Sequence, residues 1–336
     1  MNNKSRHLVI AYELDNAESL KELDTVRQSL ESILKSVENY QVSNTEDSLT
    51  FVTLMPEGGN KVISDIIQRS MQEHPEICFK SLSIKSDSYF ATKNSITELA
   101  KDQDIVVFCD SDCVYEQTFL VKTVSAMKTS NADIAFGKTY ANLEGKGLFS
   151  RIAALAWQFP PKDVPYSSVW GDSRWANNFA VLGSTLKINP FPEINFERSN
   201  PPQIKIEGVL WLIEATKQGM KIVDTDASCS HHIFDTFGEF VARQFVHGVA
   251  DVTLYKLQER PLLYAPLSSM GFPLFRLRGL IRLLKLKSIK PVEAVLALFL
   301  LLSAIPARLF GAILYTPTKL KLTKKPSVVS QTGTDQ

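Results

Sequence analysis

The sequence has little cysteine, almost no net charge and no evident leader segment. Its 336 residues include four cysteines, none of them in a C-x-x-C pair. We interpret them as small core residues in a reducing compartment, which argues against a disulfide framework or a cysteine-based zinc site. The 37 basic and 36 acidic residues nearly cancel. No global positive field therefore points to a nucleic-acid partner, and we expect none.

The first residues also lack the apolar stretch of a signal peptide, because M-N-N-K-S-R-H leads directly into a short apolar run. We therefore expect the folded part of the chain to be cytoplasmic. With 44% hydrophobic and 22% charged residues, the chain can bury one large core or two modest ones.

What the sequence does contain is a regular alternation of apolar runs and helical periodicities. Runs typical of strands lie at residues 8–11, 49–55, 77–84, 105–109 and 134–140. Apolar residues recur at helical spacing over 20–37, 62–71, 91–101 and 119–127. This alternation predicts an α/β fold with a mostly parallel sheet and right-handed crossovers.

Regularity weakens between residues 148 and 202, where three tryptophans and seven prolines lie among polar residues. We expect a substrate-side loop or lid here, or an extended segment that packs its tryptophans on the core. Beyond it the pattern predicts a helix over 206–217 with Gly219 as its C-terminal cap, strands near 220–223 and 227–232, and a helix near 237–257.

Two carboxylates follow the most apolar strand, in the turn Asp110-Ser111-Asp112. The carboxyl end of a strand in an α/β sheet is where ligands bind, and both side chains can enter one crevice there. Mg²⁺ and Mn²⁺ favour a few carboxylates combined with phosphate oxygens. In the structural alternative the turn caps the next helix, but the repulsion between two carboxylates then remains unrelieved. The turn therefore predicts a divalent-metal site on Asp110 and Asp112.

The residues before this turn carry a resemblance. The run A-T-K-N-S-I-T-E-L-A, followed by an apolar strand and D-S-D, resembles the family 2 glycosyltransferases, an inverting family of the GT-A fold. Lys93-Asn94 stands where Arg-Asn is usual, and a looser likeness covers residues 7–255. The resemblance implies a Rossmann-like mixed sheet, a nucleotide-diphosphate sugar donor held partly by Lys93 and Asn94, and a Mg²⁺ or Mn²⁺ cofactor.

The resemblance also implies a role for each carboxylate. Asp110 is expected to face the nucleotide ribose and the metal, and Asp112 to ligate the metal. The family's catalytic base is usually the Asp of a Glu-Asp pair, and this sequence has Glu207-Gly208 at that place. Glu207 is therefore the expected base, and the alternative is a charge that only stabilises a helix N-terminus.

Histidines and an arginine further along complete the expected site. A histidine from the region of His231 and His232 often completes the metal site in such enzymes, and only one of two neighbours on a strand can face it. We favour His231. Arg243 and His247 lie where processive members carry Q-x-x-R-W, and we expect them near the diphosphate. Because His247-Gly248 replaces Arg-Trp, a processive polymerase is not indicated.

The nucleotide-base pocket is implied only by position. The family has characteristic residues after its first and second strands, where this sequence has A-Y-E and P-E-G-G. We expect Tyr12 to stack on the base and Glu57 to accept its N–H. The identity of the base does not follow.

Two other classes of protein also fit parts of the sequence. The run F-C-D-S-D-C-V matches the first motif of haloacid-dehalogenase-type phosphatases, with Asp110 as nucleophile and Asp112 as acid. That motif normally opens its domain, whereas three strand–helix units precede it here, and Gly171-Asp172 lacks the expected downstream aspartate. The second alternative is a non-catalytic nucleotide-sugar-binding relative, suggested by Gly208 and the altered base pocket.

The C-terminal part differs in composition from the rest. Residues 276–290 read R-L-R-G-L-I-R-L-L-K-L-K-S-I-K without an acidic residue, and 292–315 is almost continuously apolar. This combination predicts a segment on the cytoplasmic face of a membrane, either peripheral or a re-entrant hairpin bent at Pro306. The alternatives are a spanning helix and a buried helix pair. A membrane anchor would suit a lipid-linked acceptor, although the acceptor itself is not indicated.

We therefore divide the chain into a GT-A domain at residues 1–258, membrane-associating helices at 259–320 and a polar, disordered tail at 321–336. Within the first, residues 1–140 form the nucleotide-binding half and 141–258 the acceptor half.

Overall fold

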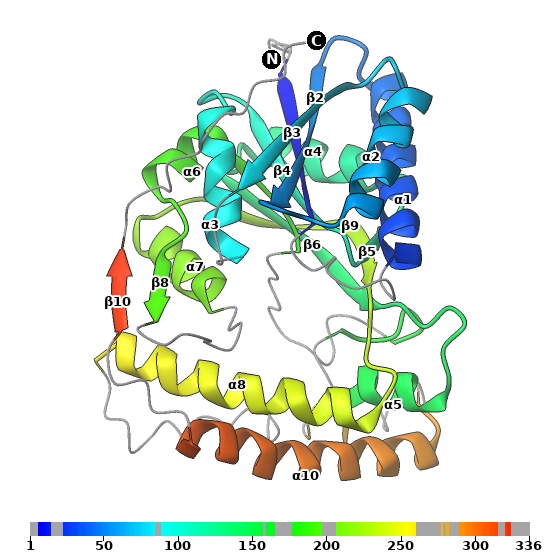
Figure 1. The fold of residues 1–336 in the computed structure, drawn as a ribbon, viewed down its shortest axis with the longest axis vertical. Helices are drawn as coiled ribbons and strands as arrows, with labels where there is room; N and C mark the ends of the chain where they lie inside the picture. The colour runs from blue at the N-terminus through cyan, green and yellow to red at the C-terminus, as the bar shows by residue number, and fades with distance from the viewer. Residues whose placement is uncertain are drawn as a thin grey trace.

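The computed structural model describes residues 6–14, 23–84, 89–156, 159–164, 177–196, 206–259, 277, 280–281, 289–314 and 320–323. In these ranges the chain forms one eight-stranded sheet flanked by helices, with a pair of long helices side by side beyond one end of it (Figure 1).

The first half of the chain follows the predicted alternation. Its elements are β1 (His7–Glu13), α1 (Leu23–Ser43), β2 (Ser48–Pro56), α2 (Lys61–Glu73), β3 (Cys78–Ile84), α3 (Tyr89–Asn94) with the 3₁₀ turn η2 (Ser95–Glu98), and β4 (Ile105–Asp110). The strands lie side by side in the order β3-β2-β1-β4 and all run parallel. The prediction of a parallel α/β sheet is confirmed for this half.

Both faces of β1 are covered. Leu8, Ile10 and Tyr12 of β1 join a core with α1, α2 and the following helix α4 (Phe119–Ser130), whereas Val9 and Ala11 join a core on the opposite face. Because alternate residues of a strand point to opposite faces, a strand buried on both sides is apolar throughout. This explains why β1 and β4 read as continuous apolar runs.

The second half completes the sheet with antiparallel pairs. Its elements are β5 (Cys113–Tyr115), α4, β6 (Ile134–Ala141), α5 (Leu148–Ala156), β7 (Asn178–Leu182), α6 (Gly183–Ile188), β8 (Glu193–Phe196), α7 (Glu207–Lys217), β9 (Ile222–His231), α8 (Phe237–Leu257), α10 (Pro291–Leu314) and β10 (Leu320–Thr323). The full strand order is β3-β2-β1-β4-β7-β6-β9-β5, and β8 pairs with β10 separately. Strands of both predicted halves thus share one sheet.

Three predictions about this half are wrong. Residues 148–202 were expected to form a loop, a lid or an extended segment, but β7 lies in the sheet between β4 and β6 and is antiparallel to both. The two strands expected at 220–232 form one strand, β9, whose pairing with β6 shifts register between Phe136 and Lys138. Such a bulge bends a strand without ending it. Residues 321–323 belong to β10 instead of a disordered tail, whose remaining residues lie outside those described.

The cap on α7 is confirmed. Gly219 follows the helix with φ of +73°, and the backbone N–H of Met220 donates to the carbonyl of Ala215 over 3.1 Å. A residue with positive φ is needed at this place, and glycine adopts it without a steric cost.

The long helices α8 and α10 run side by side, and α8 lies between α10 and the sheet (Figure 1). Their backbones approach closely, since a Cβ atom added to Gly248 would collide with the backbone of Arg308, and one added to Gly311 with that of Phe245. The helix α10 is continuous through Pro306. The hairpin predicted at this proline is therefore wrong, because the helix accommodates the missing N–H and packs against α8 on both sides of it.

Candidate functional site

The site lies where β1, β4 and β5 meet. Glu13 and Asp110 are paired in register at the carboxyl ends of β1 and β4, and the backbone N–H of Ser111 donates to the carbonyl of Glu13 over 3.0 Å. Only two residues separate β4 from β5, which pairs with β9 so that Cys113 lies opposite His231. The sheet is curled, and the short connection brings the carboxyl end of β4 close to β5 and β9 at the β5 edge of the sheet. This is the crevice position where ligands of α/β sheets bind.

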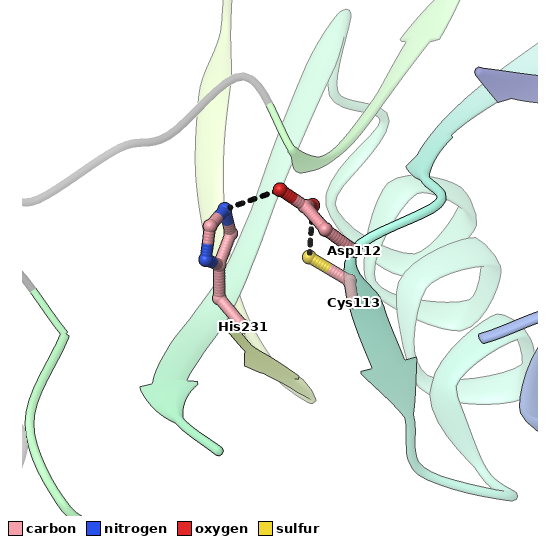
Figure 2. Close-up of side chains that lie close together, drawn as sticks. All are labelled: Asp112, Cys113 and His231. Atoms are coloured by element: carbon pink, nitrogen blue, oxygen red, sulfur yellow. Dashed lines mark hydrogen bonds and ion pairs between the residues drawn. The ribbon is translucent and has the colours of Figure 1, made fainter. Parts of the chain in front are cut away.

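Asp112 and His231 point toward each other, from the turn after β4 and from the end of β9 (Figure 2). The Oδ2 atom of Asp112 lies 3.2 Å from Nε2 of His231, and Nδ1 of His231 lies 2.6 Å from the backbone carbonyl oxygen of His232. A carbonyl oxygen can only accept, so Nδ1 must carry a proton. In the neutral ring, Nε2 then carries a lone pair that faces a carboxylate oxygen. Either a second proton or a cation must relieve this contact, and a ring N–H bonded to a backbone carbonyl is the usual support of a metal-ligating histidine.

Cys113 supports the same carboxylate. Its Sγ atom lies 3.7 Å from Oδ1 of Asp112, and burial raises the pKa of the thiol well above its usual value. The neutral S–H therefore donates to Asp112 and orients it. Asp112, Cys113 and His231 offer ligand atoms within 4.8 Å of one another, but hard cations such as Mg²⁺ prefer oxygen ligands, and a protonated thiol binds them poorly.

Asp110 has a different environment from Asp112. Its side chain is buried, and Oδ1 lies 3.6 Å from Nζ of Lys93, which also donates to Oε1 of Glu13. Three charged groups thus share one buried site directly beneath the turn. Among the described residues, the group of possible metal ligands contains Asp112 and His231 but not Asp110.

Lys93 and Asn94 are both buried in the structure. The Nζ atom of Lys93 lies 5.0 Å from the ring centroid of Phe108, within cation–π distance. The amide of Asn94 donates to the carbonyl of Phe191 and accepts from its N–H, each over 2.8 Å. The structure thus shows this pair supporting the strand ends and the segment before β8.

Tyr12 and Glu57 lie in contrasting environments. Tyr12 has no exposed surface, its ring packs 5.7 Å from that of Phe51, and its hydroxyl donates to the carbonyl of Val26. Reaching a nucleotide base would require the core to open, so we leave Tyr12 out of the proposed site. Glu57 is exposed in the turn after β2, at the same carboxyl end of the parallel strands as Asp110.

The helix α8 carries Arg243 close to Asp112, with His247 one turn further along. Burial lowers the pKa of Arg243, and the nearby Asp112 carboxylate opposes this shift. Burial also lowers the pKa of His247 well below its usual range, and the positive charges of Arg308 and Arg243 add to the shift. His247 is thus neutral and Arg243 is a cation close to the candidate metal ligands.

Glu207 is buried at the first residue of α7. The neighbouring Ile206 packs with Val249 and Ala250 of α8, which places the start of α7 against the helix that carries Arg243.

Sequence reasoning missed two residues of this region. Glu13 shares Lys93 with Asp110, and the ring of Phe159 lies 4.6 Å from that of His231 between centroids. A carboxylate at the end of the apolar strand β1 was a usable signal for Glu13, since parallel strands end at one edge. No pattern indicated Phe159, which lies in the irregular segment. Asp172, Trp170 and Trp175, also considered as part of this segment, lie outside the described residues.

The comparisons with known proteins concern fold. No protein-family model matches the sequence, and a search of curated proteins finds no match. Among solved structures, the mannosyltransferase PcManGT from Pyrobaculum calidifontis, in complex with GDP-Man and Mn²⁺, is similar with a TM-score of 0.51 at 12% identity. The likeness covers 93% of this chain and 87% of that chain. TarS 1–349 of S. aureus in complex with UDP-GlcNAc has a TM-score of 0.43 at 14% identity, covering 92% and 90%. The likeness to PcManGT shows that the chain has a GT-A-like mixed α/β fold, as the sequence predicted.

Proposed function

We propose that this protein transfers a sugar from a nucleotide-diphosphate sugar to an acceptor hydroxyl, with inversion and with a divalent cation. The observation that carries the proposal is the pair Asp112 and His231 at the carboxyl end of β4, in a GT-A-like fold. The mannosyltransferase PcManGT was solved in complex with GDP-Man and Mn²⁺, and TarS was solved in complex with UDP-GlcNAc. We assign the same class of donor to this chain.

The residues present fit a divalent cation. Asp112 and His231 would hold it, because the Nε2 atom and the carboxylate oxygen lie within 3.2 Å of each other and Nδ1 is fixed by the carbonyl of His232. Mn²⁺ and Mg²⁺ accept such a small ligand set when phosphate oxygens complete it. When bound, the cation would offset negative charge on the leaving diphosphate.

The other side chains would bind, orient and move a proton. Arg243, on α8 near Asp112, would meet the diphosphate, and Glu57 at the end of β2 would accept from the nucleotide base. Glu207 at the start of α7 would take the proton of the acceptor hydroxyl as it attacks the sugar. Lys93 would hold Asp110 and Glu13 in position beneath the donor. A single displacement of this kind inverts the anomeric centre.

One experiment tests the proposal. The purified protein is incubated with GDP- and UDP-sugars and Mn²⁺, and release of the nucleoside diphosphate is measured with and without a chelator. Release that depends on the cation and on Asp112 supports transfer. Tight binding without release would assign the chain to the non-catalytic nucleotide-sugar-binding class, which Gly208 in place of the usual aspartate would explain.

The phosphatase alternative is not favoured by the site. Its nucleophile would be Asp110, which is only 3% exposed and lies 3.6 Å from Lys93 Nζ. A nucleophile must reach the substrate's phosphorus, whereas this carboxylate is held beneath the turn. Absence of phosphate release from a chromogenic phosphomonoester would agree with this assignment.

A further inference from the structure

The outward face of α10 is apolar over the whole helix, all of which the structure describes. Its exposed residues are Pro291, Val292, Val295, Leu296, Phe299, Leu302, Pro306, Phe310, Ile313 and Leu314. They recur every three or four positions and so form one stripe along the helix. A stripe of this length on a folded surface marks an interaction site.

The charged residues of the same helix turn inward. Glu293 accepts from Nε of Arg151 on α5 over 2.9 Å, and Arg308 lies 4.0 Å from Oδ2 of Asp251 on α8. Both side chains are buried. The helix therefore keeps its ionisable groups against the protein and presents only apolar side chains outward. A soluble surface helix shows the opposite arrangement, with its polar face toward water.

The packing of α10 against α8 and α5 determines how its apolar stripe can contact a membrane. It lies along α8 for most of its length and contacts α5 (Figure 1). By length and composition it could cross a membrane. A crossing orientation, however, would carry the adjoining α8 into the hydrocarbon together with Glu239 and Lys256, at a large cost. An orientation in the plane of the membrane immerses only the outer stripe.

The charge around the helix identifies the partner. The sequence just before α10 carries six basic residues and no acidic one between Arg276 and Lys290, and four lysines follow at 319, 321, 324 and 325. Basic residues at both ends of an apolar stripe complement an anionic headgroup layer. A second copy of the chain would present the same positive charge and be repelled.

We propose that the outer stripe of α10 docks on an anionic lipid bilayer. The helix lies in the plane of the membrane, and α8 lies between α10 and the eight-stranded sheet. This surface lies apart from the donor site, so the inference stands or falls independently of the proposed transfer. It assigns the membrane contact to particular side chains and excludes a spanning α10.

Vesicle co-sedimentation of the full chain tests the contact. Phe299 and Ile313 are 64% and 65% exposed, so the double variant Phe299→Asp/Ile313→Asp should fold with an unchanged thermal midpoint. Its partitioning onto phosphatidylcholine vesicles containing phosphatidylglycerol should fall by at least about tenfold, because two apolar side chains that would enter the bilayer are lost. The matched control is Val42→Asp/Ile188→Asp, which introduces the same two charges at apolar positions of α1 and α6 that are 81% and 72% exposed and should bind like wild type.

Three results would overturn the proposal. The first is equal vesicle binding by the double variant, and the second is equal binding to vesicles of pure phosphatidylcholine. The third is a wild-type dimer in light scattering that becomes monomeric in the double variant and does not bind vesicles, since a second copy would then cover the stripe.

A labelling experiment tests the orientation. Single cysteines replace Lys290 and Thr318, on either side of α10, in a Cys78→Ser background because Cys78 is the exposed cysteine. With the protein bound to sealed vesicles, a membrane-impermeant maleimide should label both positions from outside. Protection of one position until detergent is added would show a spanning helix and exclude the in-plane orientation.

Discussion

The Nζ atom of Lys93 lies 3.6 Å from Oδ1 of Asp110 and also donates to Glu13, with all three side chains buried. The ammonium group of Lys93 gives the two carboxylates of the D-S-D turn different roles. Asp110 is held beneath the site by Lys93, whereas Asp112 is directed to His231.

Replacing Lys93 by methionine should therefore destabilise the fold. The change leaves Glu13 and Asp110 buried without the cation that they share, and breaking a buried pair from one side costs about 3–5 kcal/mol. Urea unfolding followed by circular dichroism measures the loss. The control is Lys187→Met, whose exposed ion pair with Asp102 (2.8 Å) should contribute less than about 1 kcal/mol. Equal losses in both variants would contradict a special role for the buried group.

Replacing Asp112 by asparagine should remove cation-dependent nucleotide binding without unfolding the protein. The carboxylate is partly exposed and its charge is the main attraction for a divalent ion. Calorimetry with UDP or GDP in the presence of Mn²⁺ should show an affinity at least about tenfold weaker. Asp226→Asn, which removes an exposed carboxylate paired with Lys138, should bind like wild type. Unchanged affinity in Asp112→Asn would remove this residue from the site.

The two adjacent histidines should differ in their effect on cation binding. His231 directs Nε2 to Asp112, whereas His232 contributes its backbone carbonyl to the Nδ1–H of His231. A side-chain change at His232 leaves that carbonyl in place. His231→Gln should therefore weaken Mn²⁺ binding by about 10–100-fold and His232→Gln should not. Titration followed by electron paramagnetic resonance of free Mn²⁺ compares them, and the reverse order would assign the ligand to His232.

Replacing Glu207 by glutamine should slow transfer and leave donor affinity unchanged. Loss of a general base typically costs about 10²–10⁴-fold in turnover. Glu214→Gln, in the same helix, is the matched control and should retain activity. The measurement is kcat from nucleotide release beside a binding constant for the donor. Near-normal kcat in Glu207→Gln would transfer the role to another group, with Asp172 the next candidate.

Replacing Gly248 by alanine should loosen the contact between α8 and α10. The added Cβ would collide with the backbone of Arg308, and overpacking of this kind typically costs about 1–3 kcal/mol. Gly238 lies in the first turn of the same helix, with its nearest neighbour for a Cβ at 4.0 Å. Gly238→Ala should be neutral or stabilising, because alanine favours helix. Thermal unfolding distinguishes the two, and a stable Gly248→Ala would show that the helices can separate at low cost.

Local pattern was enough for much of the fold. The first four strands and their helices were predicted because β1, β2 and β4 are buried along most of their length, β3 is a short, partly apolar run, and the long helices have one apolar side. The strand β7 was missed, since Asn178–Leu182 is short and lies in a segment rich in proline and tryptophan. Its position between β4 and β6 depends on pairing with strands distant in sequence, which local periodicity does not reveal.

The sequence by itself determined the chemistry available at each place: the two carboxylates after β4, the histidine pair that ends β9, and the apolar run of α10. Only the tertiary structure decided which of these groups meet. The pairing of Cys113 with His231 brings Asp112 to a histidine, and the parallel pairing of β1 with β4 brings Glu13 beside Asp110. Packing against α5 and α8 likewise turned Glu293 and Arg308 inward. Contacts of this kind form between residues far apart in the chain, where the registers of strands and the faces of helices set the neighbours.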